Sequence, residues 1–396
     1  MSGIRVNEWL HNSGTGGIWQ TAAGNVGIAS SVPTTKLEVT GDAKISGVST
    51  AAAFMPSGGQ LGNKNLVING SCNVAQRGTS DTSDAQGYTT VDRFKITWAG
   101  ADAIVETHQE SLSSSDTGPW AEGFRKAYKL INGNQTGGAG AGDQVIFETR
   151  LEAQDMATSG WNYTNTTSDI TLSFWVKSSV SQTFYGVLET QDGTGQNYPY
   201  SFTASSTWTK VEKTIPGNAN IQFDMDANNG IQIEFHPFMG TNFTDDSTAL
   251  NTWATAASGT RHPDMTSTWW TTNDATFHIT GLCLEVGSHA TPFEHRSYGD
   301  DLLRCQRYYE GIYMTDGTAL MKGYAAYGSS ANFEYQFAVQ KRAKPTWSLE
   351  GNAAWSGATP NAYESASSCM FQVNAGTLFS LGDADGDLCG SFNAEL

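Results

Sequence analysis

The sequence contains few charged residues: Asp, Glu, Lys and Arg together make up 15% of its 396 positions. No run of Lys or Arg occurs, and 39 acidic against 22 basic residues give a formal net charge of -17. Because an acidic surface repels phosphate backbones, we expect no nucleic-acid partner. No apolar stretch approaches the ~20 residues that cross a bilayer, so we also expect no membrane insertion.

Cysteine is scarce and scattered. The five cysteines form no CxxC pair and no zinc-finger spacing with histidine. They are Cys72, Cys283, Cys305, Cys369 and Cys389. We expect buried thiols in a protein that is synthesised in a reducing cytoplasm. The N-terminus lacks the basic start and apolar core of a signal peptide.

Catalytic signatures are absent from the sequence. GxSxG, HExxH, a Walker loop and a dinucleotide fingerprint are all missing, and the seven histidines are dispersed. We therefore predict no enzymatic activity and no cofactor. Asp383, Asp385 and Asp387 alternate like the start of a calcium loop, but Leu388 stands where the loop needs glycine and no Glu follows at the last ligand position. Turn chemistry explains them equally well, so we predict no metal, with these three as the weak candidates.

What the sequence does contain is glycine (43 residues), many Thr, Ser and Asn, and 11% aromatic residues, including 12 Trp. Disordered chains combine low hydrophobicity with high charge and few aromatics, which is not the case here. Aromatic and β-branched residues suit pleated surfaces. The composition therefore predicts an ordered, all-β protein with polar turns.

Residues 1–57 form a distinct glycine-rich segment that ends in a linker of small residues, Pro and Gly. From Leu37 to Ile45 the odd positions are Leu, Val, Gly, Ala and Ile, whereas the even positions are polar. This period-two pattern predicts a half-buried strand. So short a segment cannot bury its apolar stripe alone. We expect two further copies of the chain to cover it; the alternative is one hairpin packed on the next domain.

The stretch GNVGIASSVPTTKLEVTGDA at 24–43 resembles the shaft repeats of bacteriophage tail fibres, with Ala29 at a position where that pattern has glycine. Bacterial surface fibres share the pattern. The resemblance implies intertwined, homotrimeric β-structure. It also implies that the N-terminus docks to a phage tail or baseplate protein.

Residues 58–297 alternate short apolar runs with turn residues and read as about nine strands. Size and strand number favour a jelly-roll sandwich over an immunoglobulin-like one. NLVING at 65–70, QRGT at 76–79, DRF at 92–94 and ATPFEHRS at 290–297 occur in order along this stretch. Together they resemble phage tail proteins with carbohydrate-binding-module-like jelly rolls, although Cys283 replaces a usual Gln. A cyanophage is one source that the resemblance suggests.

Residues 298–396 begin with one predicted helix, in which Leu302, Leu303 and Gln306 recur at helical spacing and an Asp can cap the first turn. LLRCQRYY at 302–309 and KRAKPT at 341–346 extend the same resemblance. Alternation at 332–339 and strands near 371–373 and 378–381 predict a C-terminal β-sandwich domain.

Aromatic side chains are the candidate ligand-binding groups, because flat rings stack on sugars. The candidates lie in polar, loop-like stretches; packing in the core is the alternative for each. They are Trp120, Trp161, Tyr163, Tyr198, Tyr200, Trp253, Trp269 and Trp270. We expect one ring of the Trp269-Trp270 doublet to be exposed, and we expect Trp175 and Trp208 to lie in the core.

These observations predict a virion protein: a homotrimeric tail fibre that attaches a phage to a host surface polysaccharide or lipopolysaccharide. One alternative is a structural adaptor or decoration fibre of the tail. A glycan depolymerase is a further alternative, although the long regular repeats of a parallel β-helix are missing.

Overall fold

The computed structural model describes residues 8–10, 17–40, 62–313, 319–324, 331–350, 354–357, 359–373, 378–382 and 388–396. The chain divides into two compact units, Met1–Met55 and Pro56–Leu396. The first boundary lies close to the predicted one at residue 57. The predicted second and third domains, 58–297 and 298–396, fall within the same unit.

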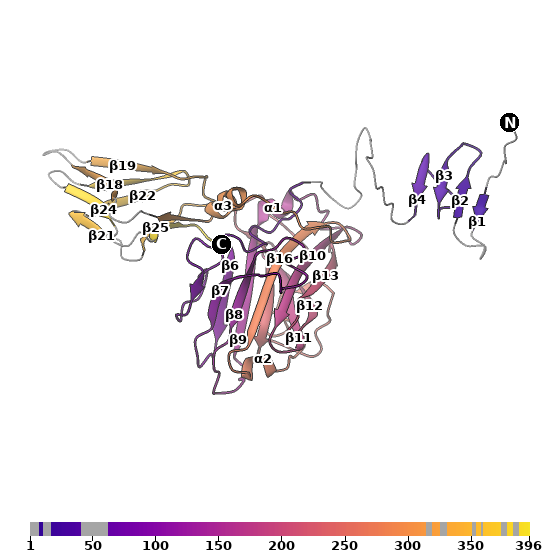
Figure 1. The fold of residues 1–396 in the computed structure, drawn as a ribbon, viewed down its shortest axis with the longest axis horizontal. Helices are drawn as coiled ribbons and strands as arrows, with labels where there is room; N and C mark the ends of the chain where they lie inside the picture. The colour runs from indigo at the N-terminus through magenta and orange to yellow at the C-terminus, as the bar shows by residue number, and fades with distance from the viewer. Residues whose placement is uncertain are drawn as a thin grey trace. The chain divides into compact units, whose positions relative to one another are not determined.

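The described residues of the first unit form a four-stranded sheet (Figure 1). Its strands are β1 (Glu8–Leu10), β2 (Gly17–Gln20), β3 (Val26–Ile28) and β4 (Leu37–Val39). β1, β2 and β3 pair antiparallel, and β4 joins β3 in parallel. The strand predicted from Leu37 to Ile45 ends at Val39, and positions 41–50 lie outside the described residues. Leu37 is 62% exposed and Val32 is 75% exposed, so one chain leaves its apolar stripe open.

The jelly roll of the second unit consists of two six-stranded antiparallel sheets. We call the sheet with the order β13-β10-β16-β8-β7-β5 the front sheet. Its strands are β5 (Ser80–Asp81), β7 (Glu106–Ser111), β8 (Lys126–Ile131), β10 (Asp169–Ser178), β13 (Thr209–Pro216) and β16 (Thr276–Val286). The predicted jelly-roll sandwich is confirmed.

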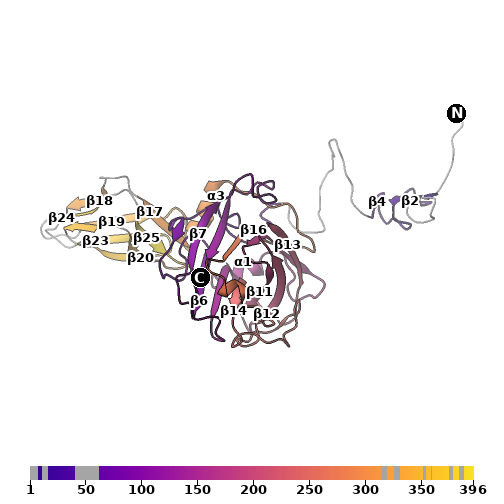
Figure 2. The same ribbon diagram turned by 60° about the horizontal axis from the view of Figure 1, so that its bottom comes forward.

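The second sheet, which we call the back sheet, has the order β15-β12-β11-β14-β9-β6. Its strands are β6 (Phe94–Ala99), β9 (Gln144–Glu152), β11 (Gln182–Thr190), β12 (Gln196–Ala204), β14 (Asn229–Met239) and β15 (Ala254–Thr255). In Figure 2, β7, β16 and β13 of the front sheet lie in one layer, facing β6, β14, β11 and β12 in the other.

The core lies between these sheets because alternate residues of most long strands are apolar. In β10, Ile170, Leu172, Phe174 and Val176 all point inward and are fully buried. Phe174 packs edge-on against Phe235 of β14, with ring centroids 4.9 Å apart. The intervening side chains of each strand must therefore lie on the outer faces of the sandwich.

Among the described residues, three helices accompany the sheets: α1 (Ala153–Ala157), α2 (Thr268–Thr271) and α3 (Tyr298–Gln306). α3 is the predicted helix. Its cap is Ser297, whose hydroxyl accepts a hydrogen bond from the Asp300 amide at 3.2 Å, rather than an Asp. A Ser at the N-cap satisfies an amide that the helix itself leaves unpaired.

The described residues of the C-terminal part form three three-stranded sheets. Their strands are β17 (Tyr309–Tyr313), β18 (Ala319–Tyr324), β19 (Ala331–Gln336), β20 (Thr346–Leu349), β21 (Ala354–Gly357), β22 (Asn361–Glu364), β23 (Ser368–Val373), β24 (Leu378–Gly382) and β25 (Leu388–Asn393). Ile312, Phe337, Phe371 and Phe392 form a small core between β17, β23 and β25. The strands predicted near 371–373 and 378–381 are therefore confirmed.

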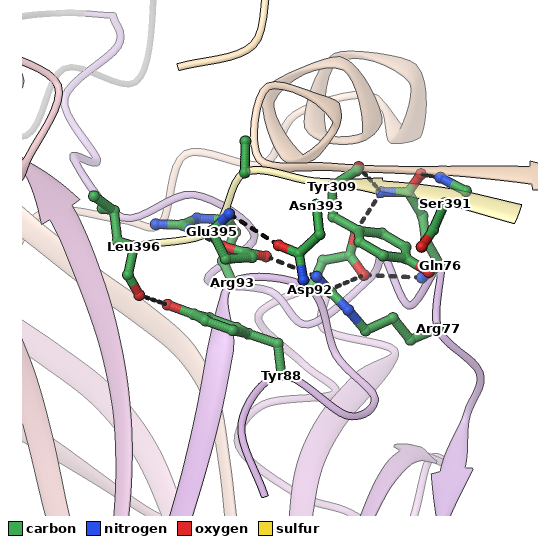
Figure 3. A network of polar contacts seen from close by, with 12 residues as sticks. Gln76, Arg77, Tyr88, Asp92, Arg93, Tyr309, Ser391, Asn393, Glu395 and Leu396 are labelled. Carbon is green, nitrogen blue, oxygen red and sulfur yellow. Dashed lines mark hydrogen bonds and ion pairs between the residues drawn. The ribbon is translucent and has the colours of Figure 1, made fainter. Parts of the chain in front are cut away.

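A polar network joins this C-terminal part to the jelly roll (Figure 3). The guanidinium of Arg93 lies 3.5 Å from the ring centroid of Tyr308 and is paired with Glu395. Arg77 lies 3.5 Å from the ring centroid of Tyr309 and 3.2 Å from a carboxylate oxygen of the same Glu395. The QRGT and DRF motifs thus contact the CQRYY motif, although more than 200 positions separate them in the sequence.

We call this connection the joint and define it by Gln76, Arg77, Asp92, Arg93, Tyr308, Tyr309 and Glu395. Further hydrogen bonds and ion pairs stabilise it. Gln76 donates a 2.8 Å hydrogen bond to the Tyr309 carbonyl. Arg307 makes a two-pronged ion pair with the buried Glu152, with N–O distances of 2.7 and 2.8 Å. Because these partners are buried, the joint is a fixed connection rather than a linker.

Candidate functional site

The outer face of the front sheet carries partly exposed tryptophans. Trp175 occupies the position on β10 between the buried Phe174 and Val176, so its indole lies on the opposite side of the sheet from the core. It packs with Trp120, Trp208 and Phe293 around a small outer cluster. Since all three indoles are only half-buried, we call this surface the tryptophan face.

A loop spanning residues 112–125 covers part of this face and anchors to it through the buried Phe124. Phe124 meets Phe293 edge-on, with ring centroids 4.8 Å apart. Gly118 has a φ of +99°, and a Cβ there would lie 2.6 Å from the Trp175 ring. Only glycine therefore allows the loop to lie this close to the indole.

Two carboxylates fix the orientation of the rings. The Trp208 indole donates to Asp116 at 2.9 Å, and the Trp175 indole donates to Glu122 at 3.0 Å. Lys177 pairs with Asp116 at 3.0 Å and lies 4.8 Å from the Trp208 ring centroid. Each polar group is thus held in place before any ligand arrives, which lowers the entropic cost of binding.

The charge state of Asp116 follows from these contacts. Partial burial alone would raise its pKa. Hydrogen bonds from the Ser113 amide, the Trp208 indole and Lys177, together with the charge of Lys177, nevertheless hold the pKa of Asp116 well below its usual value. Asp116 is therefore an ionised acceptor at neutral pH, and it is unsuited to donate a proton.

His278 of β16 lies next to Trp208 and is hydrogen-bonded to the carboxylate of Glu110. Its Nε2 lies 2.8 Å from Glu110, and its ring contacts Trp208 edge-on. Burial lowers the pKa of His278 although Glu110 opposes that shift. The hydrogen bond with His278 in turn lowers the pKa of Glu110 to about 2.

A hollow of about 510 Å³ adjoins the tryptophan face and is lined by Glu122, Lys210, Phe293 and His295, among others. Lys210 pairs with Glu122 at 3.2 Å. Flat rings beside fixed carboxylate and ammonium groups can stack on a polyhydroxyl ligand and bind its hydroxyls. Within the described ranges, no three His, Cys, Asp or Glu side chains come together as a metal site would require.

Most of the eight aromatic residues that the sequence predicts as ligand-binding do not lie on the tryptophan face. Trp120 belongs to the tryptophan face, and Tyr163 is half-buried elsewhere. The other six rings are buried and present no face to a ligand: Trp161, Tyr198, Tyr200, Trp253, Trp269 and Trp270. Asp383, Asp385 and Asp387 lie outside the described residues.

The expectation that one ring of the Trp269-Trp270 doublet is exposed is wrong, because both rings are 0% exposed. The doublet lies in α2 rather than on a strand. Asn132 donates hydrogen bonds to the carbonyls of both tryptophans, at 2.6 and 3.0 Å. The indole of Trp270 donates to the Gly138 carbonyl at 2.6 Å, so the pair closes the end of the sandwich.

Sequence reasoning also misplaced two tryptophans of the tryptophan face. Trp175 and Trp208 were expected in the core, yet both are half-buried on the outer side. The signal was present for Trp175: the alternation of Ile170, Leu172, Phe174 and Val176 assigns position 175 to the other side of the strand. Trp208 precedes β13, where no alternation applies.

All five cysteines are buried thiols, as expected. Within the described ranges, none of the three helices has the length and hydropathy needed to cross a lipid bilayer.

No protein-family model matches the sequence. No curated protein sequence matches it significantly. Among solved structures, one similar domain is the enzymatically active domain of tailspike protein 4 of bacteriophage CBA120, with 11% identity and a TM-score of 0.29 over 56% of this chain and 21% of that one.

Two carbohydrate-binding modules are similar over about the same share of this chain. The family 11 module of a Clostridium thermocellum cellulosomal cellulase shows 12% identity and a TM-score of 0.26, over 54% of this chain and 97% of that one. The N-terminal cellulose-binding domain of Cellulomonas fimi β-1,4-glucanase C shows 13% identity and a TM-score of 0.25, over 55% of this chain and 99% of that one. With scores this low, the jelly-roll assignment rests on the strand order and register of the chain itself.

Proposed function

We propose that the chain is a non-enzymatic attachment protein of a bacteriophage tail, and that its tryptophan face binds a glycan of the host surface. The observation that carries the proposal is the grouping of Trp120, Trp175 and Trp208, all half-buried, on one outer side of the front sheet. Indole faces stack on the apolar faces of sugar rings, and ionised carboxylates accept their hydroxyl hydrogens.

The assembly we propose is a homotrimer held through the first unit. In one chain, Ile18, Ile28, Val32 and Leu37 of that unit are all more than two-fifths exposed. Two further copies would cover them, and the shaft-like sequence at 24–43 supports this arrangement. Three linked sites raise avidity, so weak affinity at each tryptophan face suffices for attachment. We further propose that the N-terminus docks to a tail or baseplate protein within the virion.

Binding of the purified chain to a panel of bacterial surface polysaccharides and lipopolysaccharides tests the glycan proposal. We expect saturable binding to at least one glycan, and a loss of about tenfold or more for Trp175→Ala or Trp208→Ala, since stacking on an aromatic ring contributes on the order of 1 kcal/mol or more. Tyr298→Ala is the matched control, because Tyr298 is 58% exposed on α3 and lies outside the tryptophan face.

Other outcomes would favour the rival functions. If both tryptophan variants bind as the unsubstituted chain does, the jelly roll acts as a spacer, as in an adaptor or decoration fibre. If reducing sugar ends appear when the chain is incubated with a polysaccharide, and Glu122→Gln abolishes their release, the protein is a depolymerase instead.

A further inference from the structure

A second pocket lies on the outer side of the back sheet, between β12 and the loop that follows β14. Its volume is about 290 Å³, and Asn197 and Pro199 of β12 form its floor. Tyr198, Tyr200 and Phe202 of the same strand point into the core, so Asn197 and Pro199 face outward, away from it. The back sheet is the opposite layer of the sandwich from the tryptophan face.

Asn197 is 4% exposed, and its side-chain oxygen accepts no hydrogen bond from any described residue. A buried acceptor without a donor destabilises the folded protein, and most buried polar groups have a partner. The backbone next to Asn197 is hydrogen-bonded, since the Asn251 amide donates to the Pro199 carbonyl at 2.8 Å. The unpaired oxygen is therefore a specific feature of the pocket floor rather than a sign of loose packing.

The walls of the pocket are made of hydroxyl groups and methyl groups. Five of the lining side chains carry a hydroxyl: Ser247, Thr248, Thr252, Thr255 and Thr260. None of the lining side chains is charged. Hydroxyls both donate and accept hydrogen bonds, so they match a ligand that does the same.

The charges nearest the floor are already paired. Glu189 of β11 is the register partner of Asn197, and its carboxylate binds Arg261 at 2.8 Å. Arg261 is also paired with Glu234. One guanidinium shared by two carboxylates leaves no spare positive charge for an acidic sugar.

We propose that this pocket binds one neutral sugar residue, with a ligand hydroxyl donating to the side-chain oxygen of Asn197 and with Thr and Ser hydroxyls bonding the others. A cavity of this size accommodates a monosaccharide unit. The site is independent of the tryptophan face, because the two lie on different sheets and share no residue.

The test is saturation-transfer NMR on the full chain, with the methyl glycosides of glucose, galactose and mannose as probes and glucuronic acid as the anionic comparison. We expect transfer to at least one neutral glycoside and none to glucuronic acid. Asn197→Ala and Thr255→Val should each weaken binding at least tenfold. Thr203→Val is the matched control, because Thr203 is exposed on the outward face of β12 but does not line the pocket.

The melting temperature separates a binding role from a structural one. If the oxygen of Asn197 serves a ligand, Asn197→Ala melts no lower than the unsubstituted chain. Trp208→Ala should leave binding at this pocket intact, which distinguishes it from the tryptophan face. The proposal is overturned if no neutral glycoside binds, if Thr255→Val binds unchanged, or if Trp208→Ala abolishes the signal.

Discussion

Phe174 occupies the centre of the jelly-roll core, where three aromatic rings meet. It is 0% exposed and contacts Phe202 and Phe235 edge-on, at centroid distances of 5.2 and 4.9 Å. We expect Phe174→Ala to lower the free energy of unfolding by about 3–5 kcal/mol, because the cavity it leaves is lined by other rings that cannot collapse into it. Denaturant unfolding followed by tryptophan fluorescence measures the loss.

The control for this change is Tyr298→Ala, an aromatic truncation at a position that is 58% exposed. It should alter the free energy of unfolding by about 0.5 kcal/mol or less. A loss below ~1 kcal/mol for Phe174→Ala would show that the two sheets do not pack as described.

Asp92 makes stability depend on pH in a predictable direction. Complete burial raises its pKa to about 6, although Arg77 and the hydrogen bonds of Gln76 oppose the shift. The folded state then retains a proton that the unfolded state releases near pH 4, so this group's contribution to stability falls as pH rises from about 4 to 6. Asp92→Asn should remove this pH-dependent contribution to the free energy of unfolding.

The measurement is the difference in unfolding free energy between the unsubstituted chain and Asp92→Asn at several pH values. We expect this difference to decrease by roughly 1–3 kcal/mol from pH 4 to pH 6 and to level off above. A difference that is constant across this range would mean that Asp92 keeps an ordinary pKa when folded.

What the sequence discloses about single residues depends on periodicity. Trp175 follows the alternation of β10, so that pattern contradicts the expectation that Trp175 lies in the core and assigns it to the outer side. Trp269 and Trp270 lie in a four-residue helix within an irregular stretch, where no period applies. Their burial depends on Asn132 and Gly138, which lie more than 130 positions away, and local patterns carry no information about such distant partners.

At the scale of strands and helices, short apolar runs between turn residues predicted most jelly-roll strands, and residues recurring at helical spacing predicted α3. The order of the strands was not predictable in the same way. β10 pairs with both β13 and β16, and the pairing with β16 is interrupted by a bulge between Ser173 and Trp175. Several strands have similar inward-facing residues, so sequence alone does not specify which of them are neighbours.

The joint explains why several motifs occur together. QRGT, DRF and CQRYY served as signatures of a resemblance, without a physical role. In the structure, Arg77 stacks on Tyr309 and Arg93 stacks on Tyr308. Both guanidinium groups pair with Glu395, which lies beside them in Figure 3. Planar guanidinium groups suit this combination of stacking and ion pairing, which lysine does not reproduce.

This joint yields a prediction about the C-terminal elements. Arg93→Ala removes one of the two cationic partners of the buried Glu395 and the stacking on Tyr308, and we expect it to lower the free energy of unfolding by about 3–5 kcal/mol. It should also expose the chain after α3 to proteases, since β17 and β25 are held to the jelly roll at this point. Limited proteolysis with mass spectrometry, alongside thermal unfolding, measures both effects.

Lys344→Ala is the matched control in the same part of the chain. Lys344 is 68% exposed and pairs with Glu364 at 3.6 Å. Removing this surface pair should cost less than about 1 kcal/mol and should leave the protease pattern unchanged. If Arg93→Ala behaves like Lys344→Ala, the joint is not what holds the C-terminal elements in place.

At the scale of the whole molecule, the question is how many copies of the chain associate through their first units. Its short sheet leaves Leu37 62% exposed and Val32 75% exposed, while the polar Glu38 is hydrogen-bonded to Ser30 and Thr34. Apolar side chains in so small a sheet gain stability only when another surface covers them. This is the physical reason to expect self-association, and the shaft-like sequence favours three copies.

The molar mass of the full chain, measured by light scattering, gives the number of copies. We expect a molar mass of three times 42.5 kDa, and we expect Leu37→Asp to reduce it to that of one chain, because a carboxylate cannot be buried unpaired between copies. Thr35→Asp adds the same charge at an exposed polar position and should remain trimeric. Glycan binding by the Leu37→Asp chain should weaken at least tenfold through loss of avidity, with each tryptophan face intact. A monomeric unsubstituted chain would exclude the trimer and leave attachment to depend on the affinity of one face.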